Sequence, residues 1–160
     1  MSVGEDKQTV VDAARVTART GSAYPSPFDE PVAGRAKRAL GDAAGLDQFG
    51  VNLVTLPPGV WSSQRHWHEN EDEFVYILEG DATLVTDAGE SLLTPGMAAG
   101  FPAGRRNGHH LINKSGAPVV YLEVGTRADD ETAHYSDIDM IARKEGGAFV
   151  FIRKDGEPYG

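Results

Sequence analysis

The sequence predicts an all-β protein with antiparallel strands, and three observations lead to this fold class. From residue 49 onward, short runs rich in Val, Leu, Phe and Tyr recur along the chain. Turn-forming stretches such as "PPG", "DAGE" and "NKSGAP" separate these runs, and no strong helical pattern lies between them. Strands that recur about every eight to twelve residues in this way are typical of an antiparallel sandwich or barrel.

Each predicted strand combines apolar or β-branched residues with a turn signal at both ends. The hairpin "TLVTDAGESLLT" is the clearest case, because a four-residue loop joins two alternating segments. The predicted strands are 49–56, 61–68, 73–80, 82–86, 90–94, 97–101, 109–113, 119–124 and 148–153.

The N-terminal region has a different character. Residues 1–33 contain Pro25, Pro27 and Pro31, and one short helix is expected over 10–18. We therefore expect an irregular arm over residues 1–45 that packs on a barrel domain formed by residues 46–160.

Composition limits the classes of function. A chain of 160 residues without an evident repeat is most simply one domain. Its net charge of −9 argues against a nucleic-acid partner, because little would neutralise phosphates. No apolar run is long enough to cross a bilayer and no export signal is visible, which favours a cytoplasmic protein without a membrane partner. Cysteine is absent, so any metal must be held by nitrogen and oxygen.

The stretch "HWHENEDEFVYILEG" places chemistry on predicted strands. Alternate side chains share a face of a strand, so Gln64, His66 and His68 face the same way. Glu73 returns on the next strand, on the same face as two apolar residues. Two imidazoles and a carboxylate are ligands expected for Fe, Mn, Co, Ni, Cu or Zn. A third imidazole is available from His109 or His110.

Simpler interpretations compete with a metal site. A pair of histidines two residues apart often lies on an exposed edge strand. The acidic stretch 69–72 is interpreted as a solvated turn, which leaves Glu73 as the carboxylate best placed to point inward. Ser62 and Ser63 do not form a nucleophile motif of the "G-x-S-x-G" type, so a hydrolase is disfavoured.

The strand over 73–80 is apolar on both faces. One face, with Val75 and Ile77, can line the barrel interior. The other carries Phe74, Tyr76 and Leu78, which a second sheet or a neighbouring subunit must cover. We therefore expect a homodimer.

Two segments resemble the motifs of the cupin superfamily. The first motif has a glycine, a spacer, H-x-H, three or four residues, Glu, six residues and Gly. Here four residues separate His68 from Glu73 and six separate Glu73 from Gly80, whereas the spacer from Gly59 to His66 has six residues instead of the usual five.

The second cupin motif has a glycine, five residues, P-x-G, two residues, His, three residues and Asn. Gly96, five residues and "PAG" at 102–104 match, and His109 stands three residues before Asn113. Four residues rather than two precede His109, and the spacing to Asn113 selects it over His110.

The resemblance implies a double-stranded β-barrel of the jelly-roll type, the cupin fold. It also implies one divalent transition metal, Fe, Mn, Ni, Cu or Zn, at the centre of the barrel. The ligands it implies are His66, His68, Glu73 and His109.

Three further residues are candidates for a role beside the metal. Gln64, one step before His66 on the same face, either hydrogen-bonds substrate or metal-bound water or is a polar residue at the barrel mouth. Tyr121 and Glu123 share a strand face, and if this face points inward, Glu123 is a candidate proton carrier. Arg105 and Arg106, just ahead of His109, either grip an anionic substrate or lie solvated in a loop.

The cupin motifs specify a fold rather than a reaction. We expect a metal-dependent enzyme that acts on a small organic molecule, with dioxygenase-like chemistry first. The alternatives are a sugar or sugar-phosphate isomerase or epimerase, and a non-catalytic cupin that binds a small molecule.

Overall fold

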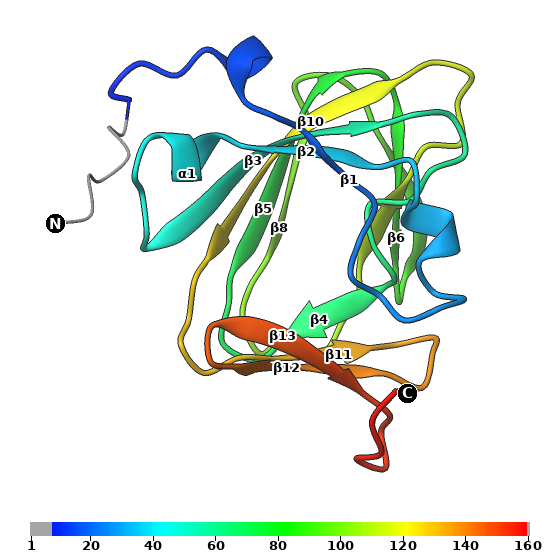
Figure 1. Ribbon diagram of the computed structural model, residues 1–160. Coiled ribbons are helices and arrows are strands. Elements are labelled where there is room, and N and C mark those ends of the chain that lie inside the picture. Colours follow the sequence, from blue (N-terminus) through cyan, green and yellow to red (C-terminus); the bar gives the residue numbers. More distant parts are fainter. Residues whose placement is uncertain (1–7, 160) are drawn as a thin grey trace, which may run out of the picture.

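The computed structural model describes residues 8–159, and every strand pairing in them is antiparallel (Figure 1). We call the six-stranded sheet the large sheet. Its strands lie in the order β1 (Arg19–Thr20), β2 (Ala36–Ala39), β3 (Phe49–Leu56), β10 (Val119–Thr126), β5 (Glu73–Glu79) and β8 (Ala98–Phe101). The all-β class and the antiparallel arrangement predicted from the sequence are confirmed.

Two smaller sheets lie against the large one. The C-terminal sheet has the order β13 (Ala148–Ile152), β12 (Ile141–Glu145), β11 (Thr132–Tyr135) and β4 (His66–His68). The small sheet has the order β7 (Gly89–Leu93), β6 (Ala82–Thr86) and β9 (His110–Ile112). In Figure 1, β4 lies beside strands from the other end of the chain. The helical segments are short: η1 (Ala13–Arg15), η2 (Glu30–Val32) and α1 (Leu40–Ala43). None of the helices within residues 8–159 has the length and apolar character needed to span a membrane.

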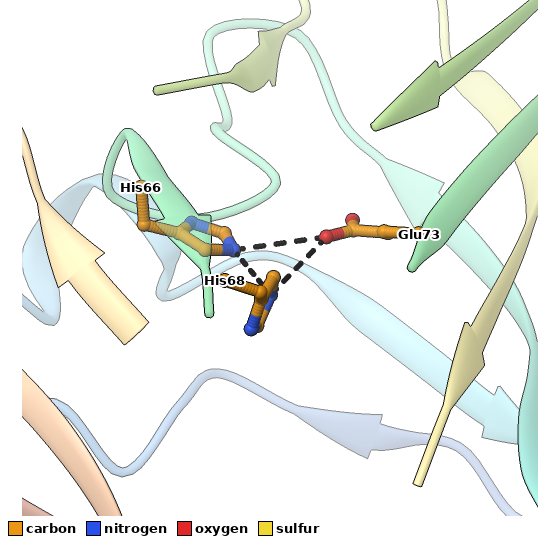
Figure 2. A group of neighbouring side chains, drawn as sticks. All are labelled: His66, His68 and Glu73. Atoms are coloured by element: carbon orange, nitrogen blue, oxygen red, sulfur yellow. Dashed lines mark hydrogen bonds and ion pairs between the residues drawn. The ribbon is translucent and has the colours of Figure 1, made fainter. Parts of the chain in front are cut away.

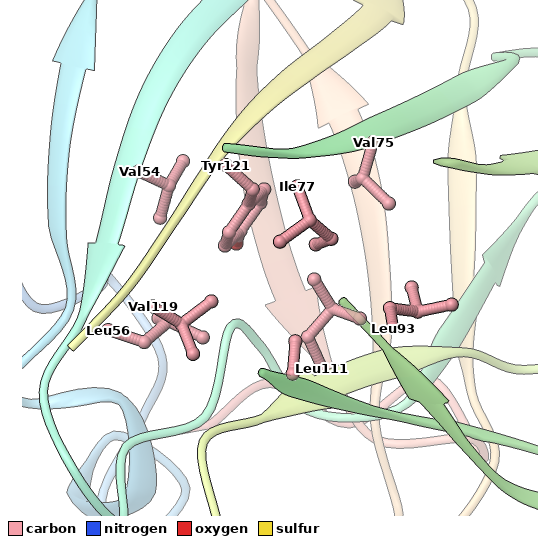
Figure 3. Close-up of a cluster of buried hydrophobic side chains, with 9 residues drawn as sticks. Val54, Leu56, Val75, Ile77, Leu93, Leu111, Val119 and Tyr121 are labelled. Carbon is pink, nitrogen blue, oxygen red and sulfur yellow. The ribbon is translucent and has the colours of Figure 1, made fainter. Parts of the chain in front are cut away.

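Side chains from the large and small sheets meet in one apolar core (Figure 3). Alternation decides which residues take part, because every second side chain of a strand points to the same face. The fully or nearly buried members are Val54, Leu56, Val75, Ile77, Ala82, Leu93, Leu111, Val119 and Tyr121. A second apolar cluster belongs to the C-terminal sheet. Its buried members come from β11, β12 and the residues between them: Ala133, Tyr135, Met140 and Ala142.

Strand β5 has the two faces that its sequence predicts. Val75 and Ile77 are buried, whereas Phe74, Tyr76 and Leu78 lie on the opposite face with 38–44% of their surface exposed. A homodimer that covers this face stays a prediction.

The expected helix over 10–18 is wrong. Only the single turn η1 forms there, capped by the Asp12 carboxylate, which accepts from the Ala14 amide. β-branched residues before and after this turn favour extended backbone, and Val16 is extended. The Arg38 side chain donates to the carbonyls of Ala13 and Val16, so this turn is held to β2 by hydrogen bonds.

Other boundaries differ from the sequence prediction. The strand expected over 61–68 is reduced to β4, because Ser62 bends away and its hydroxyl accepts from the Leu111 amide. The hairpin of β6 and β7 forms, but Thr86 pairs with Gly89, which leaves a two-residue loop instead of four. The short strands β1, β2, β11 and β12 were not predicted.

Gly80 ends β5 where only glycine fits. Its φ is +76°, and a Cβ atom at this position would lie 2.3 Å from the carbonyl oxygen of Pro118. A side chain would therefore suffer both backbone strain and a clash with the backbone that leads into β10.

We expect Gly80→Ala to lower the free energy of unfolding by at least about 1–2 kcal/mol, because the left-handed conformation alone costs that much. Chemical denaturation measures the change. Gly116→Ala is the control, because a Cβ there meets nothing within 4 Å and no positive φ is needed. Equal stability of the two variants would contradict this account of Gly80.

Candidate functional site

Backbone pairing on both sides of β4 positions the two histidines of the H-x-H motif. On one side β4 pairs with β11, with Tyr135 opposite His66. On the other side His66 and His109 exchange two backbone hydrogen bonds, of 3.2 and 2.9 Å. Directly paired residues point to the same face. The pairing therefore brings His109 to the H-x-H motif despite the two extra residues that precede it.

Three side chains form a compact group of candidate metal ligands (Figure 2). The Nε2 atoms of His66 and His68 lie 3.1 Å apart. Oε2 of Glu73 lies 3.7 Å from Nε2 of His66 and 3.4 Å from Nε2 of His68. Two ring nitrogens this close must share a proton or face a common cation. These three residues come from β4 and the start of β5, as the sequence predicted.

His109 joins this group through Glu73. Its Nε2 lies 3.0 Å from Oε2 of Glu73, and its ring stacks on Phe101 at 3.5 Å between centroids. His110 points elsewhere: its Nδ1 bonds to the Ser63 carbonyl at 2.8 Å, and its ring meets Trp61 edge to face. The geometry thus brings His109, and not His110, to the other candidate ligands.

The donor set fits a divalent transition metal. Nδ1 of His66 donates to the Gln64 carbonyl at 2.8 Å, which leaves the Nε2 lone pair free to bind a cation. Three imidazole nitrogens and one carboxylate oxygen, without sulfur, suit Fe, Mn, Ni, Cu or Zn.

The charges of the group favour an ionised carboxylate. Burial alone would raise the pKa of Glu73, but contacts with His109, His66 and His68 outweigh it and hold that pKa well below its usual range. Burial lowers the pKa of His109, which favours the neutral ring that a metal requires.

Behind His68 lies a carboxylate that the sequence analysis did not identify. Glu131 is fully buried, and its oxygens accept from the amides of Glu69 and Asn70, each at 2.9 Å. Its Oε1 lies 3.5 Å from Nδ1 of His68. Burial opposes the charge of His68, but Glu131 and Glu73 raise its pKa to about 10. Carboxylate oxygens of Glu71 and Glu131 thus lie on the Nδ1 side of the His68 ring, and Nε2 faces Glu73.

The interpretation of 69–72 as a solvated turn is wrong for Glu71. This residue is 8% exposed, and its Oε2 accepts from Lys144 at 3.1 Å and from the Ala128 amide at 2.9 Å. Its other oxygen lies 3.8 Å from Nδ1 of His68. Glu71 therefore connects the turn before β5 to β12 of the C-terminal sheet by a hydrogen bond. No pattern within the turn predicts this contact, because the two partners of Glu71 lie 57 and 73 positions later in the chain.

The candidate ligands open into a cavity of about 250 Å³ between the large and C-terminal sheets. Tyr121 and Glu123 line it, so their shared face points inward. Oε2 of Glu123 accepts from Lys37 at 2.9 Å and from Asn52 at 3.2 Å. Burial raises the pKa of Tyr121 well above its usual value, which keeps its hydroxyl protonated. The volume lies just below the range typical of drug-sized ligands and suits a small metabolite.

The cavity also contains residues that the sequence gave little reason to select. Arg35 and Lys37 line it from β2 and the turn before it, and Tyr24 and Tyr135 line it from the arm and β11. All four lie outside the motifs that identify the metal ligands. Strand pairing brings two of them to the site, Lys37 through β2 with β3 and Tyr135 through β11 with β4.

Gln64 lies differently from its predicted place, whereas Arg105 and Arg106 are exposed in the loop before His109, in agreement with the solvated-loop alternative. Gln64 is buried, and its amide nitrogen donates to the Phe28 carbonyl at 2.9 Å, away from the residues that line the cavity. Arg105 lines a second cavity of about 300 Å³ beyond Phe101. The guanidinium of Arg106 lies over the Trp67 ring, 5.6 Å from its centroid.

Arg65 braces the strand that carries the histidines. It precedes β4 and forms ion pairs with Asp87 in the turn between β6 and β7 and with Asp137 beyond β11. The Arg65 hydrogen bond is the main reason that the pKa of Asp137 lies below its usual value. A carboxyl group with a lowered pKa stabilises the fold above its unfolded pKa, and this stability is lost as the pH falls through the folded value.

We expect Asp137→Asn to reduce stability at pH 7 by up to about 1 kcal/mol, a small value because the carboxylate is largely exposed. The difference from the unmodified protein should shrink below about pH 4, where this carboxyl begins to take up a proton. Thermal unfolding from pH 3 to pH 7 measures it, with Asp129→Asn in an exposed loop as the control. A difference that grows as the pH falls would contradict the assignment.

We expect His66→Ala and Glu73→Ala to weaken binding of a divalent metal by more than about 100-fold, because each removes a direct ligand. Elemental analysis and metal titration after reconstitution measure this, and circular dichroism checks the fold. His110→Ala is the matched control and should retain the metal. Full metal occupancy in both ligand variants would refute the assignment.

The comparisons with known proteins agree with the motifs and the fold. The cupin domain model matches residues 52–125. A sugar phosphate isomerase of the cupin superfamily from Silicibacter pomeroyi is 48% identical, with a TM-score of 0.91, and the match covers 94% of this chain and 96% of that one. This chain therefore belongs to the cupin superfamily.

Two more distant structures share the fold. A provisional sugar phosphate isomerase from Acidithiobacillus ferrooxidans is 24% identical, with a TM-score of 0.82, covering 98% of this chain and 99% of that one. The polyketide cyclase RemF from Streptomyces resistomycificus is 24% identical, with a TM-score of 0.60, covering 74% of this chain and 79% of the other. Among curated protein sequences, none matches this chain.

Proposed function

We propose that this protein is a metal-dependent isomerase or epimerase that acts on a phosphorylated sugar. The observation that carries the proposal is the 48% identity with a sugar phosphate isomerase over 94% of the chain. Dioxygenase-like chemistry came first in the sequence analysis, but this relative favours the isomerase alternative. The small mixed cavity beside the candidate ligands is consistent with a sugar-sized substrate.

The residues for metal binding are His66, His68 and His109 through Nε2 and Glu73 through Oε2. A divalent metal held there would supply a Lewis acid that polarises neighbouring oxygens of a sugar. The ligands are fixed by paired backbone on β4, β5 and the residue before β9.

Isomerisation also requires a group that moves a proton between two neighbouring carbons. Glu123 is the candidate base, because its carboxylate lines the cavity and is held in place by Lys37 and Asn52. It would take a proton from one carbon and return it to the next. The Tyr121 hydroxyl, kept protonated by burial, would donate a hydrogen bond to a substrate oxygen during this transfer.

The test is an anaerobic assay of the protein loaded separately with Fe²⁺, Mn²⁺, Ni²⁺ or Zn²⁺. Aldose and ketose phosphates are followed by NMR in deuterated water, which reports both interconversion and exchange of the transferred proton. We expect Glu123→Gln to lower kcat by roughly 10²- to 10⁴-fold, the usual contribution of a general base. Glu79→Gln, exposed at the end of β5, is the control and should leave kcat unchanged.

Three outcomes separate the functional hypotheses. Interconversion without oxygen supports the isomerase. Oxygen consumption with a substrate, without interconversion, would instead indicate an oxygenase. Tight binding of a sugar phosphate, without conversion in the presence of any of the four metals, would indicate a non-catalytic binding protein.

A further inference from the structure

Arg35 brings an unneutralised positive charge into the cavity. Its Nη1 donates to the Ser62 carbonyl at 2.6 Å and its Nη2 to the Gly21 carbonyl at 2.8 Å. A guanidinium has five N–H donors, so three remain after these two bonds. Nε is buried, and within residues 8–159 it has no hydrogen-bond partner.

The partners of Arg35 are neutral, which sets it apart from the other cation in the cavity. Lys37 forms an ion pair with Glu123 at 2.9 Å, whereas no carboxylate of the described chain lies within 4.0 Å of the Arg35 guanidinium. Charges that leave water are normally paired, so a buried donor beside a cavity favours an anionic ligand.

The charge balance of the cavity points the same way. Its described lining contains two cationic side chains, Arg35 and Lys37, and two carboxylates, Glu73 and Glu123. These charges cancel, so a divalent metal on the candidate ligands would leave an excess of two positive charges. A phosphate monoester carries about two negative charges at pH 7 and would neutralise this excess.

Two tyrosines line the same cavity as Arg35. Tyr24 comes from the arm and Tyr135 from β11, and the hydroxyl of each can donate one hydrogen bond. Tyr135 donates to the Tyr24 oxygen at 3.3 Å, which leaves the Tyr24 proton free for a ligand. The Tyr135 ring lies 5.5 Å from the His66 ring, so this donor set borders the candidate ligands.

We propose that Arg35, with the Tyr24 hydroxyl that Tyr135 orients by its hydrogen bond, forms the subsite that binds the phosphate group of the substrate. The proposal rests on the proposed function, since it assumes that the substrate is a sugar phosphate. The subsite lies outside the matched cupin domain of residues 52–125. The arm and β11 therefore supply recognition of the anion, while the cupin motifs supply the metal ligands.

The experiment measures binding of inorganic phosphate to the metal-loaded protein by isothermal titration calorimetry. We expect Arg35→Gln to weaken phosphate binding about 10- to 100-fold, as expected for the loss of charged hydrogen bonds. Tyr135→Phe should weaken it several-fold. Metal content is measured in each variant, so that loss of the metal is not mistaken for loss of the subsite.

Arg38→Gln is a matched control from β2, the strand that begins directly after Arg35. Arg38 also donates two hydrogen bonds to carbonyls of the arm, but it pairs with Leu53 on the opposite face of the sheet and does not line the cavity. It should reproduce any loosening of the arm without changing phosphate affinity. If Arg35→Gln does not fold, Arg35→Lys and Tyr135→Phe decide the outcome.

Several results would overturn the subsite. Undetectable phosphate binding by the unmodified protein is one, and unchanged affinity in the Arg35 and Tyr135 variants is another. Loss of binding only in Arg105→Gln would move the anion to the second cavity. If phosphate binds through Arg35 but no sugar phosphate is converted, the anion subsite stands and the isomerase proposal fails.

Discussion

The carboxylate of Glu73 among three imidazoles is the constraint on which the rest of the site depends. An ionised carboxylate that is 85% shielded from solvent is unfavourable unless cationic or hydrogen-bonding groups surround it. The strands meet this requirement by bringing Nε2 of His66, His68 and His109 to one oxygen. Each imidazole has a neighbour of its own: the Gln64 carbonyl accepts from His66, a carboxylate oxygen of Glu131 lies 3.5 Å from Nδ1 of His68, and the Phe101 ring stacks on His109.

The same arrangement explains why elements outside the cupin motifs belong to the site. β4 is only three residues long, so it depends on β11 and on His109 for its backbone partners. β11 brings Tyr135 to His66, and Glu131, the residue just before β11, lies beside His68. On the other side of the cavity, β2 pairs with β3. Lys37 of β2 and Arg35, just before it, bring two positive charges to the cavity. The candidate metal ligands and the proposed anion subsite thus come from different parts of the chain but share a single cavity.

Local patterns account for what could be predicted. Alternation along 73–79 indicated which residues of β5 face the core, and the spacing around His66 and Glu73 indicated the three clustered ligands. The prediction of a helix over 10–18 was wrong because residues that favour extended backbone surround the single turn. Gln64 is buried, but its amide donates to the Phe28 carbonyl and not into the cavity, and no local pattern predicts such a distant partner.

The sequence by itself determined most of the strands from residue 49 onward, the fold class and the types of candidate ligand, because these depend on spacing between near neighbours and on side-chain chemistry. Tertiary structure alone selected the carboxylate behind His68 and the partners of Arg35. It also decided that Tyr121 and Glu123 face inward. These features depend on pairing between strands far apart in the chain, where a shift of one residue reverses every side chain. The fold fixes that register through the burial of whole strand faces, and no single motif contains this information.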